Sequence, residues 1–412
     1  MNERLMTQSI DSQPLPTLYA RWASELLGGP IPRESQATCE NCAMCADGQE
    51  ELGSRNYYFN PDVKCCSYVP VLHNFLVGRI LSDTGADLEF GKTSVQKSIA
   101  DRVGVEPLGL APPPVYSLLY NNNERAFGRS RRLLCPHYIE DGGRCGIWRH
   151  RNSTCSTWFC KHVRGRLGEA FWRESLHPLL QIVEKDLARW CALELCLSDD
   201  ALQQSVDSAL WASVSETVTA EALDNKVDEK MYRRMWGEWL GREHEFFVGC
   251  ADIVDPLSWA EVLAICGPAA RAYAQLTERA FARLTSEEIP AALNVGSFEL
   301  VQIQQGRMRV STYSGFDTLE IPGALMELFP YFNGRPTKDA LAAIADERGV
   351  CLDHALVRKM VDFGLLNAEP NRETPPSNIP APLGQDLRSP APQRLTVLSV
   401  SSPTGRRQTP TH

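Results

Sequence analysis

The sequence lacks the features that mark membrane, secreted and nucleic-acid-binding proteins. It has no run of about 18 apolar residues, so we expect no membrane span. Its first residues, MNERLMTQSIDSQPLP, show no apolar core or cleavage pattern of a secretory signal, which favours a cytoplasmic, reducing location. The formal net charge of -9 argues against a nonspecific nucleic-acid or anionic-membrane surface as the main activity.

Familiar catalytic motifs are also missing. The glycine-containing stretches match neither the phosphate-binding loop nor the dinucleotide fingerprint, and there is no G-x-S-x-G elbow or H-E-x-x-H helix. No pair of nucleophile and base can be assigned from spacing. The sequence therefore leaves open whether the protein is an enzyme, and it indicates neither a substrate nor an oligomeric state.

The 412 residues are enough for two or three domains. The pattern predicts a mainly α fold with a loop-rich cysteine-cluster domain and a small C-terminal winged-helix-like α+β module. The expected segments are an N-terminal lead with a short helix near 18–27 (1–35), a cysteine-cluster metal-binding domain (36–165), a helical domain (166–290), the winged-helix-like module (297–367) and a disordered tail (369–412). Within the helical domain, helices are expected over 167–197, 202–218, 231–247 and 259–284, the last broken or kinked at Gly267-Pro268.

Cysteine is unevenly distributed along the chain. Of 14 cysteines, five are scattered among apolar helical neighbours and are expected to be buried small side chains: Cys191, Cys196, Cys250, Cys266 and Cys351. The other nine precede residue 161 and are the predicted metal ligands: Cys39, Cys42, Cys45, Cys65, Cys66, Cys135, Cys145, Cys155 and Cys160. In a reducing compartment, clustered cysteines favour metal binding or redox chemistry over structural disulfides.

The first group has the spacing Cys39-x2-Cys42-x2-Cys45. Bacterial ferredoxins grip an iron–sulfur cluster with this spacing, followed by a fourth cysteine three residues on. Here Gln49 stands at that place, so a fourth ligand must come from elsewhere, or only two of the three cysteines bind. The adjacent Cys65 and Cys66 offer such a ligand. Neighbouring residues on an extended chain point to opposite faces, so one of them can serve one site and the other a second site.

The last group lies in the stretch CPHYIEDGGRCGIWRHRNSTCSTWFC, residues 135–160. This piece has too few apolar residues to be held by burial, whereas thiolate–metal bonds would close its loops. Three interleaved histidines, His137, His150 and His162, are suitable ligands for zinc or iron, but each is expected to support the site or to lie at the surface.

The cysteine pattern resembles the YkgJ-type cysteine-cluster family over about residues 36–163. Cys135, Cys145 and Cys155 match the last three cysteines of its signature, with Arg151-Asn152 where the family has Arg-Pro. The early pair is either Cys42 with Cys45 or Cys65 with Cys66. The resemblance implies chelation of zinc or iron. A relative, the flagellin lysine methylase group, pairs such a cluster with a methyl donor, but no residue here supports carrying methyl transfer over.

The C-terminal pattern is a β-hairpin around Gln305-Gly306 followed by helices over 322–332, 337–348 and 353–363. Asn333-Gly334 is the predicted turn between the first two helices, and Thr337 is the predicted N-cap of the second. It resembles PqqD-like winged-helix modules, which implies a peptide or protein partner bound at the strand edge.

Three functions remain open. The first is a metal-binding protein with a structural or redox-active iron–sulfur cluster, a 4Fe-4S cluster being preferred over zinc. The second is a peptide- or protein-modifying enzyme. The third is a zinc-stapled adaptor that binds its partner through the C-terminal module.

Overall fold

The computed structural model describes residues 15–34, 39, 42–45, 59–123, 126–195, 197–198, 201, 224 and 227–368. The predicted lead up to residue 14, a predicted helix over 202–218, Cys196, and the predicted tail from residue 369 lie outside these residues. The described part is mainly helical with small antiparallel sheets, as predicted. None of its helices is both long and apolar enough to cross a membrane.

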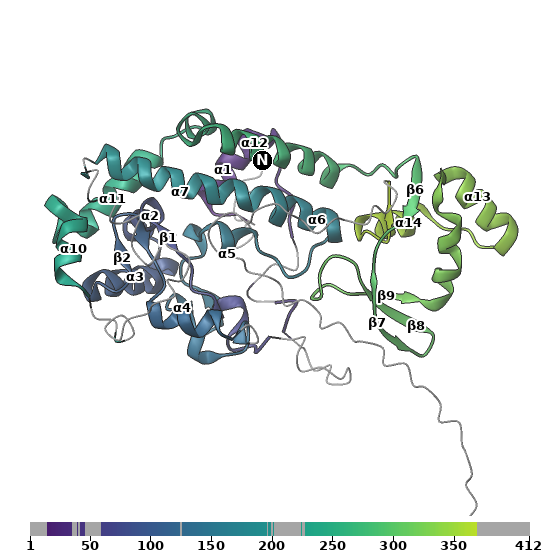
Figure 1. Ribbon diagram of the computed structural model, residues 1–412, viewed down its shortest axis with the longest axis horizontal. Coiled ribbons are helices and arrows are strands. Elements are labelled where there is room, and N and C mark those ends of the chain that lie inside the picture. Colours follow the sequence, from purple (N-terminus) through teal and green to yellow (C-terminus); the bar gives the residue numbers. More distant parts are fainter. Residues whose placement is uncertain are drawn as a thin grey trace, which may run out of the picture.

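Two long helices run along one side of the molecule (Figure 1). They are α7 (His177–Glu194) and α12 (Trp259–Thr285), and they pack against each other. The side chain of Ser258 caps α12 by accepting the backbone N–H of Glu261, whose carboxylate accepts the N–H of Ser258. At Gly267, before Pro268, φ is +73°, which kinks the helix where the sequence predicted a break.

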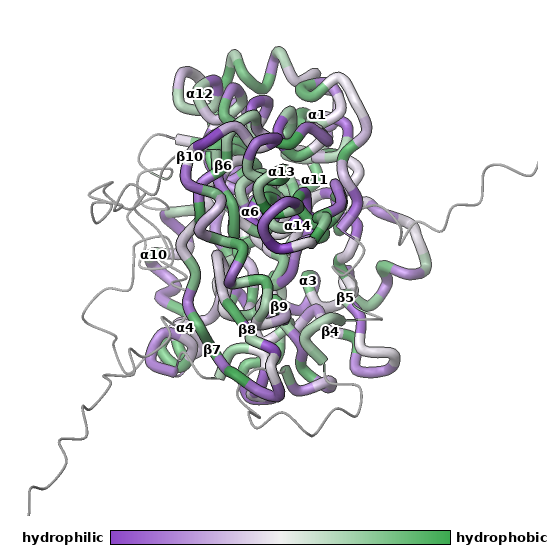
Figure 2. The backbone as a smooth tube through the Cα atoms, turned by 90° about the vertical axis from the view of Figure 1, so that its right-hand side faces the viewer, coloured by the Kyte–Doolittle hydropathy of each residue, from purple (hydrophilic) through white to green (hydrophobic). Residues whose placement is uncertain are grey.

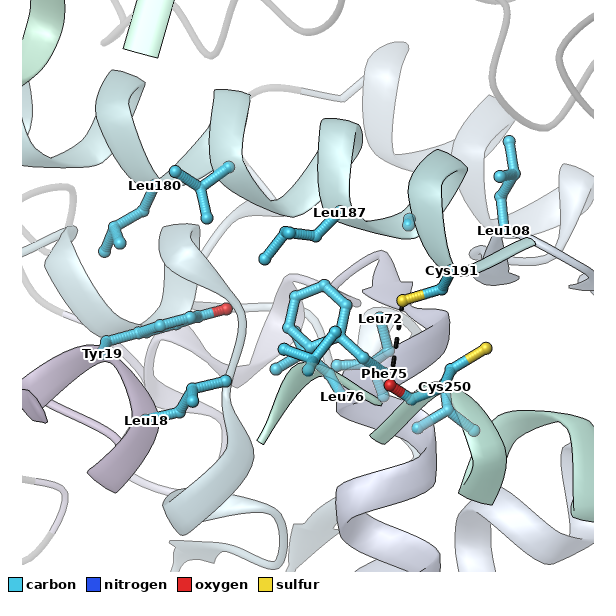
Figure 3. Packing of buried hydrophobic residues seen from close by; sticks show 14 of the residues in the cluster. Leu18, Tyr19, Leu72, Phe75, Leu76, Leu108, Leu180, Leu187, Cys191 and Cys250 are labelled. Atoms are coloured by element: carbon cyan, nitrogen blue, oxygen red, sulfur yellow. Dashed lines mark hydrogen bonds between the residues drawn. The ribbon is translucent and has the colours of Figure 1, made fainter. Parts of the chain in front are cut away.

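Beneath this pair, α2 (Asn74–Ser82) crosses α11 (Glu243–Val254), and α1 (Thr17–Leu27) packs on α12. Gly78 lets α2 and α11 approach closely, because a Cβ at this position would lie 1.9 Å from the carbonyl oxygen of Phe247. Leucine and phenylalanine side chains from α1, α2 and α7 fill the space between the helices (Figure 3).

Four of the five scattered cysteines fall on described residues. Cys191, Cys250 and Cys266 are buried as predicted, and the Cys191 thiol donates to the Cys250 carbonyl oxygen at 3.8 Å (Figure 3). Cys351 is exposed, so the prediction that it is buried was wrong. It lies in the short connection between α13 and α14, outside the core of the module.

The cysteine-bearing region is built from short elements, in agreement with its low apolar content. Its longer helices are α3 (Glu89–Asp101) and α4 (Pro114–Asn121), and α6 (Gly165–Phe171) leads through η7 (Trp172–Leu176) into α7. The shorter elements are η2 (Lys64–Ser67), β1 (Leu72–His73), η3 (Ala86–Leu88), β2 (Val105–Glu106), β3 (Gly109–Leu110), η5 (Arg131–Leu133), β4 (Tyr138–Ile139), β5 (Arg144–Cys145), η6 (Trp148–His150) and α5 (Ser153–Thr157).

The C-terminal module has its own core, formed by side chains from its strands and helices. The predicted hairpin is β7 (Glu299–Gln304) with β8 (Arg307–Ser311), and β9 (Leu319–Pro322) extends it. A second sheet joins β10 (Asn333–Pro336), β6 (Ala292–Val295) and β11 (Leu366–Asn367) in that order. The helices are η9 (Gly323–Tyr331), α13 (Thr337–Arg348) and α14 (His354–Asp362). Figure 2 turns this module toward the viewer.

Two local predictions for this module were wrong. Asn333 and Gly334 lie in strand β10 rather than in a turn, because they pair with β6. Thr337 begins α13 but does not cap it, since its hydroxyl donates instead to the carbonyl oxygen of Pro290 at 2.7 Å.

One prediction for the helical domain was also wrong. Two helices, α10 (Glu229–Trp236) and α11, with η8 (Gly237–Trp239) between them, replace the single helix predicted over 231–247.

Polar contacts attach the C-terminal module to the segment after Cys160. The Arg164 guanidinium donates to both carboxylate oxygens of Asp362, at 2.9 and 2.7 Å, and to the carbonyl oxygen of Ser286 at 2.9 Å. The His162 N–H donates to Asp317 at 3.2 Å, and the ring of Phe363 lies where a Cβ on Gly165 would stand. The module is therefore anchored next to the cysteine-bearing region.

Candidate metal centre

All nine early cysteines fall on described residues and are free thiols. Backbone contacts bring three of them together. The N–H of Cys135 donates to the carbonyl oxygen of Cys66 at 2.7 Å, and Cys145 pairs with Tyr138 between β4 and β5. The Cys66 and Cys135 side chains also share one small apolar cluster with Val69. Residues far apart in sequence thus meet on adjoining turns.

Two of these sulfurs accept backbone hydrogen bonds from the residue two places further on. The His137 N–H donates to Cys135 and the Ile147 N–H donates to Cys145, and each bond lowers the pKa of its thiol. Burial acts more strongly in the opposite direction and raises both pKa values. Backbone N–H groups that point at sulfur stabilise the thiolate form, which is the form that binds a metal.

The third thiol of this group, Cys155, is placed by a capped helix. Asn152 accepts the Cys155 N–H at 3.0 Å and so caps α5. The buried carboxylate of Glu184, on α7, accepts the backbone N–H of Ser153 at 2.5 Å and its hydroxyl at 2.6 Å. Because Ser153 and Glu184 are both buried, their hydrogen bonds fix α5 and its cysteine against the helical body.

Two cations lie beside the thiols. The Lys64 ammonium donates to the carbonyl oxygens of Cys39 at 2.5 Å and of Gly143 at 2.8 Å, and it thereby joins the first cysteine group to the β4–β5 turn. The buried Arg151 guanidinium lies 3.3 Å from the ring centroid of Trp148. The charges of both cations lower the pKa values of Cys39 and Cys65. Such cations offset the negative charge of a thiolate site.

The thiols also act on one another. The pKa values of Cys39 and Cys45 are raised to about 12, chiefly by burial and in part by neighbouring thiols. A hydrogen bond between Cys65 and Cys66 lowers the pKa of Cys65 to about 7 and raises that of Cys66. The remaining thiols, Cys135, Cys145, Cys155 and Cys160, have raised pKa values in which burial is the largest cause and the charge of Cys65 is another. The charge of Cys65 therefore adds to the effect of burial on thiols from several segments of the chain.

The structure therefore gathers the predicted ligands into one region, but it does not arrange them as a finished site. Within the described ranges, no three His, Cys, Asp or Glu side chains stand so that they could hold a metal ion. Each sulfur is one rotatable χ1 bond away from its backbone, so side-chain rotation changes the direction of a thiol without moving the fold. Metal binding by these cysteines stays a prediction.

The three neighbouring histidines differ in their partners. His150 is saturated, because its Nε2–H donates to Asp83 at 2.8 Å and its Nδ1 accepts from Arg79 at 3.3 Å. The Ser94 hydroxyl donates to the carbonyl oxygen of Gly91, so His137 Nδ1–H must be the donor in its 2.7 Å contact with that hydroxyl. The proton assignment leaves His137 Nε2 as an acceptor.

His162 differs from the other two histidines in its hydrogen bonding. Its side chain is buried, and neither ring nitrogen has a hydrogen-bond partner among the residues that the structure describes. Burial lowers its pKa to about 4. Sequence reasoning treated all three histidines alike, since only the fold shows which ring nitrogens are already bonded.

No protein-family model matches this chain, and no curated protein or solved structure matches it significantly.

Proposed function

We propose that this protein binds a metal through its clustered cysteines, as an iron–sulfur cluster in preference to zinc. One observation carries the proposal: the bond from the Cys135 N–H to the Cys66 carbonyl and the contacts of Lys64 with Cys39 and Gly143 bring cysteine-bearing segments together, with backbone N–H groups on the sulfurs of Cys135 and Cys145. This donor set suits a soft, thiophilic metal. The buried ring of His162, which has no hydrogen-bond partner within the described ranges, adds a nitrogen donor close to Cys160 in sequence.

The choice between metals follows from the number and spacing of the thiols. An all-thiolate site suits either iron–sulfur or zinc. The Cys39-x2-Cys42-x2-Cys45 triplet is typical of iron–sulfur ligation, and the other early cysteines can complete it without histidine. We therefore favour a 4Fe-4S cluster in a cytoplasmic protein. Its role is redox chemistry or part of a peptide-modifying reaction, whereas a zinc ion would act as a structural staple.

Anaerobic purification followed by metal analysis and visible spectroscopy tests this function. We expect brown protein with bound iron and sulfide, and loss of both in Cys135→Ser and Cys145→Ser. The matched control is Cys351→Ser, which removes an exposed thiol from the C-terminal module. Colourless protein that carries zinc would support the staple instead. Full-chain protein without stoichiometric iron or zinc would refute metal binding.

A specific feature also favours a partner-binding role for the C-terminal module. Strand β7 is at the edge of its sheet and all six of its residues are exposed. Leu300, Val301 and Ile303 are 48%, 40% and 64% exposed. An extended peptide can add to such an edge through main-chain hydrogen bonds, with its side chains against these apolar groups.

Peptides selected from a displayed library on the full chain test this second role. We expect the selected peptides to lose binding to Ile303→Asp and to keep it on Val350→Asp, which changes an exposed apolar residue away from β7. Equal binding to both variants would rule out strand addition at β7.

A further inference from the structure

Strand β7 leaves an apolar sheet edge uncovered within the described ranges, and one segment of the same chain is suited to cover it. This segment is residues 395–400, LTVLSV, beyond the last described residue, Ala368. On the basis of the second proposed role, in which β7 receives an added strand, we propose that residues 395–400 add to β7 and occupy its edge until another peptide displaces them.

Strand β7 differs from the other strands at the sheet edges of the module. Edge strands usually carry proline or charge, or are very short, because an unpaired backbone otherwise takes up further strands. Strand β9 ends at Pro322, β10 contains Arg335 and Pro336, and β11 has two residues. Strand β7 has six residues without proline and with a single charge, Glu299 at its start. Of the described edges in the module, that of β7 therefore accepts a strand most readily.

The exposed apolar side chains of β7 lie on the face of the sheet that carries the module core. Residues directly opposite each other on paired strands share a face. Leu300 is opposite Val310 and, past a one-residue shift in register, Ile303 is opposite Met308. Val310 is 0% exposed and Met308 packs on the same core, whereas Leu300 and Ile303 are 48% and 64% exposed. The core thus stops short of its edge strand and leaves an apolar strip beside it.

The segment 395–400 has the length and the pattern of a covering strand. It has six residues, as β7 has, and no proline, glycine or charge. Half of its residues are β-branched, which favours a strand. It offers two apolar pairs spaced two residues apart, Leu395 with Val397 and Leu398 with Val400. Strand β8 meets the apolar side chains of β7 with residues of the same spacing, so the segment can place such a pair against the strip from the other side.

The linker between the module and this segment is long enough to reach β7. It comprises residues 369–394 and starts after β11, which packs in the same core as β8. A random chain of this length has an average end-to-end distance of about 25–30 Å. A compact module of the size of residues 289–368 is about 30 Å across. Because these lengths match, the tethered segment has an effective concentration of about 1 mM at β7.

The tether makes the segment a competitor of any other peptide at β7. A tethered competitor weakens the binding of a free peptide by about the ratio of its effective concentration to its own dissociation constant. For a dissociation constant of about 0.1 mM, the weakening is about tenfold. A partner must therefore bind β7 more strongly than residues 395–400 do.

Hydrogen exchange of the full chain, followed by mass spectrometry, tests the contact. In the wild type we expect slow exchange at the backbone amides of residues 395–400 and at those of β7 that point away from β8. Both sets should exchange about ten times faster in Val397→Asp/Leu398→Asp, which places charge on both faces of the segment, while β8 stays protected. The matched control is Ile379→Asp/Leu383→Asp, which adds the same charges elsewhere in the tail and should exchange like the wild type.

A labelled synthetic peptide of residues 393–402 measures the competition by fluorescence anisotropy. It should bind Val397→Asp/Leu398→Asp about ten times more tightly than it binds the wild type, because the edge of the variant is free. The control variant Ile379→Asp/Leu383→Asp should bind it like the wild type. Adding Ile303→Asp to the Val397→Asp/Leu398→Asp variant should remove the gain.

The outcomes separate the tail contact from the role of β7 on which it rests. Library peptides that bind the wild type and Val397→Asp/Leu398→Asp equally, with fast exchange at residues 395–400, keep the partner role and overturn the tail contact. Protection of residues 395–400 that rises with protein concentration assigns them to a second copy and also overturns it. Absence of any peptide binding at β7, with fast exchange at residues 395–400, refutes both. If Ile303→Asp unfolds the module, the tail variants decide, since they change no residue of the module.

Discussion

Replacing Glu184 by glutamine should remove a large part of the pH dependence of stability. This carboxyl group is 1% exposed and accepts hydrogen bonds from the Tyr19 hydroxyl and from Ser153. Burial outweighs these bonds and raises its pKa from 4.5 to about 7. The native state therefore holds the proton more tightly than the unfolded chain does, so the stabilisation is complete below pH 4.5 and is lost as the pH rises through 7.

The expected loss of stability follows from the size of the rise in the Glu184 pKa. At about 1.4 kcal/mol per pH unit, ionising Glu184 costs the wild type about 3 kcal/mol between pH 4.5 and pH 8. Glutamine keeps an oxygen for Tyr19 and the Ser153 N–H and cannot ionise, so Glu184→Gln should be more stable than the wild type at pH 8 and similar to it at pH 5.

Urea unfolding of the metal-loaded full chain, followed by tryptophan fluorescence at several pH values, measures this difference. Glu89→Gln, which changes an exposed glutamate in the first turn of α3, is the matched control and should follow the wild type at every pH. Parallel stability curves for the wild type and Glu184→Gln across pH 5–8 would contradict the reasoning, since they would mean that Glu184 does not gain a proton on folding.

Further predictions concern packing, anchoring and charge. Gly78→Ala should destabilise the chain by about 3 kcal/mol, because the new methyl group would collide with the Phe247 carbonyl; a smaller loss than about 1 kcal/mol in urea unfolding would contradict this close approach. Arg164→Met should cost about 2 kcal/mol and speed proteolysis near Ser286, since the charged hydrogen bonds to Asp362 are lost; unchanged cleavage would argue against this anchor. Arg151→Gln should weaken metal affinity about tenfold or more in a chelator competition, and unchanged affinity would show that the guanidinium does not stabilise the bound thiolates.

Much of the fold could be predicted because local signals and tertiary packing agree. The short helix near 18–27, the hairpin around Gln305-Gly306 and the helix over 337–348 all lie where the sequence predicts them. Strands of two residues, such as β4 and β5, carry no periodic pattern and exist only through long-range pairing. The turn predicted at Asn333-Gly334 failed for the same reason, because pairing with β6 outweighs the local preference.

The candidate site shows a similar limit. Residue types and spacing predicted the cysteine ligands, and in the structure hydrogen bonds join the segment of Cys65 and Cys66 to Cys135 and to Cys39. The groups that surround the thiols could not be found from sequence. In the sequence, Lys64 and Arg151 look like ordinary surface cations, and Glu184 lies in an amphipathic helix, where a glutamate is common. Their roles depend on burial and on contacts between distant segments.

The C-terminal module lies against two segments that adjoin predicted metal ligands. The β8–β9 connection brings Phe316 against Phe59, the residue that bridges to Cys45, and brings Asp317 to the backbone of His162, two residues after Cys160. The same sheet ends in the exposed edge of β7. Because a packed sheet transmits displacement rather than absorbing it, a peptide bound at β7 should act on this connection. If the proposed iron–sulfur cluster is bound, we expect its redox potential or spectrum to change on addition of a β7-binding peptide, and the change should disappear in Ile303→Asp. An unchanged potential with bound peptide would separate the two functions.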